Sequence, residues 1–163
     1  MSALDAQVVI QSADGERRVP AEEFHRLPGG EPQRDSVLEH GELITAVELP
    51  RPPEGAVSNY RKVRDRASYA FALVSVAAEL SLSPTLEIRS ARIALGGVAH
   101  KPWRARKAEE VLVGAPATEE TFTAAAEAEL ADAEPLPGNE FKVDLARRTL
   151  IAELRALSER GLT

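Results

Sequence analysis

Residues 57 to 98 decide the fold of this 163-residue chain, and they read VSNYRKVRDRASYAFALVSVAAELSLSPTLEIRSARIALGGV. Polar and apolar residues alternate over 57–64, which is typical of a half-buried strand. An apolar run over 71–82 ends in alternation, and its alanines leave a helix open at its start. After the turn at 83–85, residues 86–98 form a further strand-like segment. The stretch therefore predicts an antiparallel meander.

The residues before this meander predict further short strands. Residues 8–10 and 17–19 flank Ala13-Asp14-Gly15, and Asp-Gly between two short apolar segments is typical of a β-hairpin. Residues 20–27 begin with a proline followed by acids and predict one or two helical turns. A glycine- and proline-rich loop follows at 28–32, and residues 43–49 predict another strand.

The last third of the chain changes to helical periodicity. We expect helices over 103–113, ended by Gly114, over 118–132, with Thr118 as N-cap, and over 139–157, with Asn139 as N-cap. The last segment places apolar residues on one helical face: Val143, Ala146, Leu150, Leu154 and Leu157. The order of strands followed by helices predicts an α+β fold, in which an antiparallel sheet of three to four strands is followed by three helices packed on one face.

Composition excludes several classes of protein. The chain has no cysteine, which removes disulfides, thiolate zinc sites, iron–sulfur clusters and a thiol nucleophile. A net charge of −6 and an aromatic content of 4% argue against nucleic acid binding. The start resembles no signal peptide, and no apolar run approaches the roughly 18 residues of a membrane span. We therefore expect a soluble, cytoplasmic domain.

The sequence lacks the common catalytic and metal-binding motifs. His25, His40 and His100 lie in different segments without the spacing of a metal site. No serine lies in a GxSxG turn, and neither Gly29-Gly30 nor Gly96-Gly97 has the spacing of a dinucleotide or phosphate loop. We therefore expect no catalytic residue and no metal ligand in this chain.

A basic segment interrupts the acidic chain. Its cations are Arg61, Lys62, Arg64 and Arg66, and only Asp65 opposes them. A solvated edge strand explains the cluster, because charged side chains protect sheet edges. A patch that meets an anion such as a phosphate explains it equally, and the residues alone leave both interpretations open.

Two segments resemble a known family. Residues 60–80 (YRKVRDRASYAFALVSVAAEL) and 91–104 (ARIALGGVAHKPWR) are similar to the FAD-binding medium subunit of the molybdenum hydroxylases. These include xanthine dehydrogenase, carbon monoxide dehydrogenase and bacterial aldehyde oxidoreductases, and the aldehyde oxidoreductase type resembles this chain most. Residues 14–24, 41–50 and 139–150 fit the same family in the same order.

The resemblance implies a division of the chain and a cofactor. Residues 1–40 would be a remnant of the FAD-binding (PCMH-type) domain, and residues 41–163 would form a CO dehydrogenase flavoprotein C-terminal-like domain. The glycine-rich loop that holds the FAD pyrophosphate in the family is missing from these residues, so FAD would be held mainly by another segment or chain. The implied partners are a molybdopterin-binding large subunit and a 2Fe–2S small subunit. This chain would help relay electrons from these partners to an acceptor. A partner's signal would also allow a periplasmic location.

The resemblance also implies flavin-contacting residues. By position these are Lys62, Arg66, Ser68 and Tyr69, at the turn that approaches the flavin in the family. Family members often carry an acidic residue near the position of Tyr69, so this chain departs from the pattern there. Two alternatives remain: Tyr60 and Tyr69 as half-buried sheet residues, and a docking module that meets a partner through its helical face and Trp103 without flavin contact.

Overall fold

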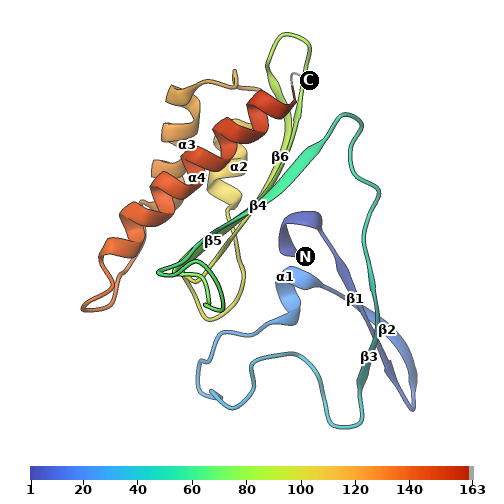
Figure 1. Cartoon of the computed structure of the whole chain (residues 1–163). Coiled ribbons are helices and arrows are strands. Elements are labelled where there is room, and N and C mark those ends of the chain that lie inside the picture. The colour runs from blue at the N-terminus through green and yellow to red at the C-terminus, as the bar shows by residue number, and fades with distance from the viewer. Residues whose placement is uncertain (162–163) are drawn as a thin grey trace.

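A computed structural model describes residues 1–161, which form two lobes joined by the linker 49–56 (Figure 1). The N-terminal lobe, residues 1–48, holds a small sheet. The C-terminal lobe, residues 57–161, holds a larger sheet with helices on one side only. The opposite face of the larger sheet, which we call the open face, turns toward the N-terminal lobe.

The N-terminal lobe begins with the short 3-10 helix η1 (Ser2–Leu4). It continues with β1 (Gln7–Ser12), β2 (Gly15–Pro20), the single-turn helix α1 (Ala21–Phe24) and β3 (Leu43–Glu48). The antiparallel strands lie in the order β2-β1-β3. Gly15 has φ +130°, a backbone conformation that glycine adopts without strain, so the predicted hairpin turn is present. The one or two helical turns expected within residues 20–27 are present as the single turn of α1.

The C-terminal lobe contains the predicted meander. Its strands are β4 (Val57–Val63), β5 (Val74–Leu82), β6 (Ile88–Gly96) and the two-residue β7 (Trp103–Arg104), antiparallel in the order β4-β5-β6-β7. The helices α2 (Arg106–Leu112), α3 (Glu119–Leu130) and α4 (Phe141–Arg160) follow. The predicted α+β class, with an antiparallel sheet and helices packed on one face, is confirmed.

Alternation along the strands separates the two faces of this sheet. Val76 and Leu80 of β5 and Ile93 of β6 are fully buried and pack under the helices, in one cluster with Phe122 and Leu154. The side chains between them point the other way because successive strand residues face opposite sides. Glu153 of α4 is also fully buried, and its carboxylate accepts hydrogen bonds from Asn59 (2.6 Å) and Arg61 (2.7 Å) of the edge strand β4.

Two local predictions in the helical part are wrong. Residues 103–104 pair with β6 as a strand before the helix begins, because Leu95 and Ala94 offer backbone partners to Trp103 and Arg104. Asn139 does not cap α4: the N-cap is Glu140, whose carboxylate accepts from the backbone N–H of Gly138 instead. Thr118 does cap α3, since its hydroxyl oxygen accepts from the N–H of Thr121.

A buried ionic cluster fixes the N-terminal lobe on the open face. The guanidinium of Arg104 is almost fully buried, donates to the carboxylates of Asp5 (2.6 Å) and Glu109, and also reaches the carbonyl of Ser2. Arg92 pairs with the same Asp5 and with Glu79. Burial alone would lower the pKa of Arg104, but its hydrogen bonds to Glu109 and Asp5 outweigh burial and raise that pKa. The cluster therefore stays charged and sets the relative position of the lobes.

Candidate functional site

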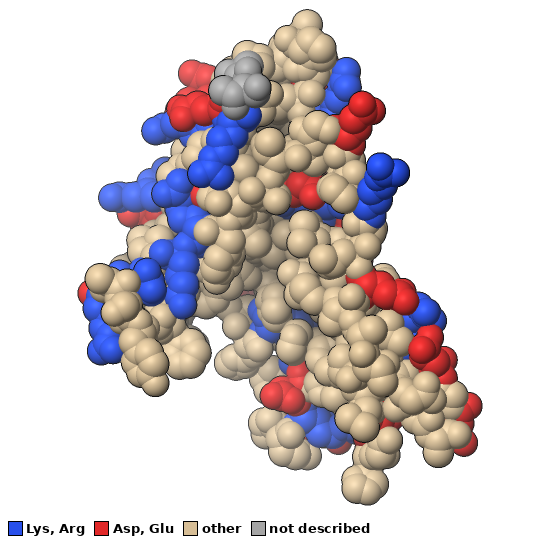
Figure 2. Space-filling model, turned by 45° about the vertical axis from the view of Figure 1, so that its right-hand side comes forward, with Lys and Arg blue, Asp and Glu red and all other residues tan. Residues whose placement is uncertain are grey.

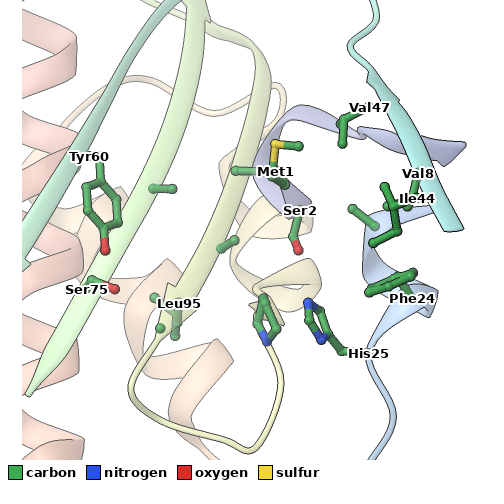
Figure 3. A pocket seen from close by; sticks show the side chains of 16 residues that line it. Met1, Ser2, Val8, Phe24, His25, Ile44, Val47, Tyr60, Ser75 and Leu95 are labelled. Carbon is green, nitrogen blue, oxygen red and sulfur yellow. The ribbon is translucent and has the colours of Figure 1, made fainter. Parts of the chain in front are cut away.

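The two lobes enclose a groove of about 390 Å³, and the molecular surface is hollowed between them (Figure 2). One wall comes from the N-terminal lobe, with Phe24, Ile44 and Val47 (Figure 3). The other is the open face, with Tyr60, Ala77 and Ala94. Apolar side chains dominate both walls, and a groove of this size and character is typical of a site for a small organic molecule.

Small residues make the open-face wall flat. The register aligns Tyr60 with Ala77 and Ala94, and the next row on the same face aligns Lys62 with Ser75 and Gly96. A Cβ atom at Gly96 would lie 2.5 Å from Oγ of Ser75, so a side chain at Gly96 would displace the serine. A planar apolar group fits such a surface, and Lys62 lies on the same face in the row after Tyr60.

The other three predicted flavin-contacting residues lie beyond the end of β4, in the loop 64–73. Arg66 donates through Nε to the carbonyl of Ser68 (2.9 Å), so these two are brought together. Tyr69 has φ 52° and is 95% exposed. The interpretation of Tyr69 as a half-buried sheet residue is therefore wrong. Among residues 1–161 no hydrogen bond or ion pair joins Lys62 to the other three.

The adjacent loop 97–102 supports the loop 64–73. Gly97 has φ +75°, and a Cβ atom there would lie 2.7 Å from the carbonyl oxygen of Leu73. Only glycine permits this close approach. Lys142 of α4 donates to the carbonyl of Gly97 (2.9 Å). The loop that carries Tyr69 therefore packs at its end, Leu73, against Gly97, which α4 in turn contacts through Lys142.

The basic segment divides into two kinds of cation. Arg61 points to the helix side, where it neutralises the buried Glu153. Lys62, Arg64 and Arg66 are exposed and have no acidic partner in the described part of the chain. Most other arginines of the chain form ion pairs, so these three leave local positive charge on an acidic protein. Arg61 thus has a structural role that neither interpretation gave it, and a contact of the other three cations with an anion stays a prediction.

The remaining candidates have structural roles or none. Trp103 is 43% exposed, but its indole N–H donates to Glu129 (2.8 Å) within the lobe. His25 lines the groove, whereas His40 and His100 are exposed in loops. Within residues 1–161 no group of three His, Asp or Glu side chains is arranged to hold a metal ion. In the same range no helix combines the length and apolar character of a membrane span.

Sequence reasoning missed most of the groove. Its N-terminal wall, with Phe24 and Ile44, comes from segments that looked only like a strand and a short helix. The signal on the other wall was present as the small residues Ser75 and Ala77 at alternate positions, next to the larger Val74 and Val76. That pattern indicates an open face without indicating what lies opposite.

Both lobes match known families. Residues 58–156 match the CO dehydrogenase flavoprotein C-terminal domain, and residues 1–52 match the FAD binding domain in molybdopterin dehydrogenase. The strand β3 therefore lies within the second match, beyond the expected boundary at residue 40, and it pairs with β1. The division at residue 40 itself stays a prediction.

Whole proteins show the same similarity. The aldehyde oxidoreductase FAD-binding subunit of Escherichia coli is 47% identical over 161 residues, which are 96% of this chain and 46% of that relative. The glyceraldehyde dehydrogenase medium chain of Sulfolobus acidocaldarius is 36% identical over 114 residues, 70% of this chain and 38% of that relative. Among solved structures, carbon monoxide dehydrogenase from Hydrogenophaga pseudoflava aligns with a TM-score of 0.87 and 28% identity, over 98% of this chain and 54% of that chain. Quinoline 2-oxidoreductase from Pseudomonas putida aligns with a TM-score of 0.85 and 28% identity, over 100% of this chain and 55% of that chain. The chain thus spans about half the length of these proteins.

Proposed function

Because this chain belongs to the CO dehydrogenase flavoprotein C-terminal domain family, we propose that it is the flavin-covering part of an FAD-binding subunit in a molybdenum-containing oxidoreductase. One observation carries the proposal. A lobe that matches an FAD binding domain and a lobe that matches a flavoprotein C-terminal domain face each other across an apolar groove.

The residues of the groove fit part of FAD. The flat wall of Ala77, Ala94 and Gly96 suits a planar ring system, and the aromatic side chains of Tyr60 and Phe24 suit its faces or edges. The described residues include no glycine-rich loop of a dinucleotide fingerprint, which agrees with a cofactor whose phosphates are held mainly elsewhere. When bound, FAD supplies the redox chemistry by accepting electrons and passing them on.

The side chains of this chain would orient and shield the cofactor. The ammonium of Lys62 stabilises negative charge at the border of the groove, and the exposed Arg66 with Ser68 and Tyr69 extends the cover beyond the strand end. The apolar walls exclude water, which strengthens electrostatic interactions inside the groove. In this proposal the chain contributes orientation and shielding rather than bond-making.

The proposed assembly includes a molybdopterin-binding large subunit and a 2Fe–2S small subunit. Electrons from these partners would reach the flavin and leave to an acceptor. Two relatives are named as a subunit or chain of larger enzymes, an aldehyde oxidoreductase and a glyceraldehyde dehydrogenase, which supports this arrangement. The substrate would be set by the large subunit, and a cytoplasmic location stays a prediction.

The test is FAD affinity with and without a second polypeptide. That polypeptide corresponds to the part of the Escherichia coli aldehyde oxidoreductase subunit outside the match. We expect the chain alone to bind FAD weakly and the mixture to retain it, measured by flavin absorbance after gel filtration. Tight, stoichiometric FAD binding by the chain alone would contradict the proposal that another polypeptide holds most of the cofactor.

Two variants locate the contact. Lys62→Met should weaken FAD binding by the mixture by about tenfold, which is about 1.4 kcal/mol. Arg89→Met is the matched control, since Arg89 is an exposed strand cation on β6 without an acidic partner in the described residues. If Lys62→Met and the double variant Arg66→Ala/Tyr69→Ala leave FAD affinity and reduction rate unchanged, the alternative of a docking module without flavin contact is favoured.

A further inference from the structure

The strand β3 is exposed along its whole length although its sequence, LITAVE, is mostly apolar. Leu43 is 68% exposed, Ile44 45% and Val47 42%. Leu49, just beyond the strand, is 56% exposed. β3 is also the outer strand of its sheet, and no backbone group on its outer edge has a strand partner among residues 1–161. A long apolar edge strand of this kind promotes pairing with another chain.

The other three sheet edges of the molecule are protected. β2 carries Glu16, Arg17 and Arg18 and ends at Pro20, so charge and a missing N–H oppose strand addition. β4 carries Arg61 and Lys62, and β7 is only two residues long. Since the same chain protects every other edge, the unprotected edge of β3 indicates a surface made for contact.

A β-bulge gives β3 apolar side chains on both faces. The register pairs Val8 with Val47 and Ile10 with Ile44, and it shifts between these pairs at Thr45. Ile44 and Val47 therefore share one face and line the groove between the lobes (Figure 3). Leu43 pairs with Gln11 on the opposite face. Strands with apolar residues on both faces are usually interior strands, covered on both sides.

The similar proteins indicate the occupant. This chain covers 46% of the Escherichia coli relative and 54% of the carbon monoxide dehydrogenase chain, so those proteins contain about as much polypeptide again. β3 lies in the part that matches the FAD binding domain. A strand from the unmatched part would supply the backbone partners that β3 lacks and would cover its apolar side chains.

We propose that the outer edge of β3 binds an extended, apolar strand of an FAD-binding polypeptide equivalent to that unmatched part. This inference rests on the proposed function. The added strand continues the sheet as β2-β1-β3-partner, with main-chain hydrogen bonds for affinity and pockets beside Leu43 and Val47 for alternate side chains. The same contact brings the partner to the mouth of the groove, where the flavin would lie.

The experiment uses the full chain and, as probe, the unmatched part of the Escherichia coli aldehyde oxidoreductase subunit, prepared without flavin. We expect a one-to-one complex in analytical ultracentrifugation. The double variant Leu43→Lys/Val47→Lys should weaken it by at least about tenfold, because lysine on an edge opposes strand addition. Leu136→Lys is the control, since Leu136 has the same 68% exposure in the C-terminal lobe.

Hydrogen exchange tests the same contact without a variant. We expect the probe to slow exchange at alternate amides of β3, because only every second N–H of an edge strand points outward. An unaffected complex in the double variant, or unprotected β3 amides in the wild-type mixture, would overturn the inference. Self-association of the chain that Leu43→Lys/Val47→Lys abolishes would overturn it in favour of a second copy as occupant.

A further comparison separates this inference from the proposed function. The variant Lys62→Met should bind the flavin-free probe normally, since Lys62 lies on the other lobe. If Leu43→Lys/Val47→Lys weakens docking while Lys62→Met leaves FAD affinity unchanged, the docking surface is supported and the flavin-covering role is contradicted. If Lys62→Met weakens FAD binding while Leu43→Lys/Val47→Lys leaves docking unchanged, the flavin-covering role is supported and the docking surface is contradicted.

Discussion

The two lobes are built on different physical principles. The C-terminal lobe buries one continuous cluster of 17 apolar residues between sheet and helices, whereas the buried cluster of the N-terminal lobe consists of Val8, Ile10 and Phe24. The N-terminal lobe relies instead on ion pairs and on the cluster around Arg104, and its strand β3 is exposed. Hydrophobic burial is the main favourable contribution to folding. We therefore expect the C-terminal lobe to be stable by its own core, and the N-terminal lobe to depend on its contacts with neighbouring segments.

The largest expected effect is the loss of a core side chain in the C-terminal lobe. Leu154→Ala should lower the free energy of unfolding by about 2–5 kcal/mol, because Leu154 is fully buried in a cluster that cannot collapse around the cavity. Ile10→Ala removes an equally buried side chain from the small cluster and should unfold only the N-terminal lobe locally. Urea denaturation with residue-level hydrogen exchange distinguishes the two. A similar shift of the main transition in both variants would refute the comparison.

An intermediate effect is expected from the ionic cluster between the lobes. Arg104→Met leaves the buried Glu109 with only the longer contact to Arg106 (3.6 Å) and removes the contacts to Asp5 and Ser2. Removing one partner of a fully isolated buried pair costs about 3–5 kcal/mol, and we expect less here because Glu109 keeps both the N–H of Ile93 and the guanidinium of Arg106 as partners. We expect faster exchange in β1 and an altered interlobe distance by spin labelling. The control Lys107→Met removes only an exposed pair with Asp132 and should change neither.

The smallest effect is expected from acid. Arg17, together with the N–H of Glu39, lowers the pKa of Glu42 to about 2, from an ordinary value of 4.5, and Arg18 lowers the pKa of Glu48. Carboxyl groups with lowered pKa values stabilise the folded state above pH 4.5 and lose that contribution as the pH falls through the folded pKa. The N-terminal lobe should therefore loosen between about pH 4 and pH 2, as measured by NMR of β2 and β3 amides. Loosening of the same amides above pH 5 would require another titrating group.

Periodicity was sufficient for the elements of the C-terminal lobe. Alternation over 57–64, the apolar run over 71–82 and the helical stripe that includes Leu150 and Leu154 reflect burial on one face, which depends on local geometry alone. The predictions that failed depend on neighbours. Trp103 and Arg104 form a strand because β6 has a free edge, and Asn139 loses the cap position because the nearby Glu140 competes for the backbone.

For the predicted site residues, too, the sequence indicated residue types but not the contacts between distant segments. Lys62 and Arg66 carried a visible signal, since a basic cluster in an acidic chain is a property of composition. Which of the neighbouring cations neutralises a buried carboxylate depends on α4, which lies some ninety positions later in the chain. The opposing wall of the groove, with Ile44 and Val47, depends on how the lobes meet.

The sequence by itself determined the α+β class, the meander and the family, because these follow from local patterns of residue type. Tertiary structure alone decided that two lobes enclose a groove, that Arg61 pairs with a buried carboxylate while Lys62 is exposed, and that β3 is left unprotected at an edge. The reason is physical. The pattern of residue types determines which face of a strand is apolar. Contacts between segments far apart in the chain determine what packs on that face.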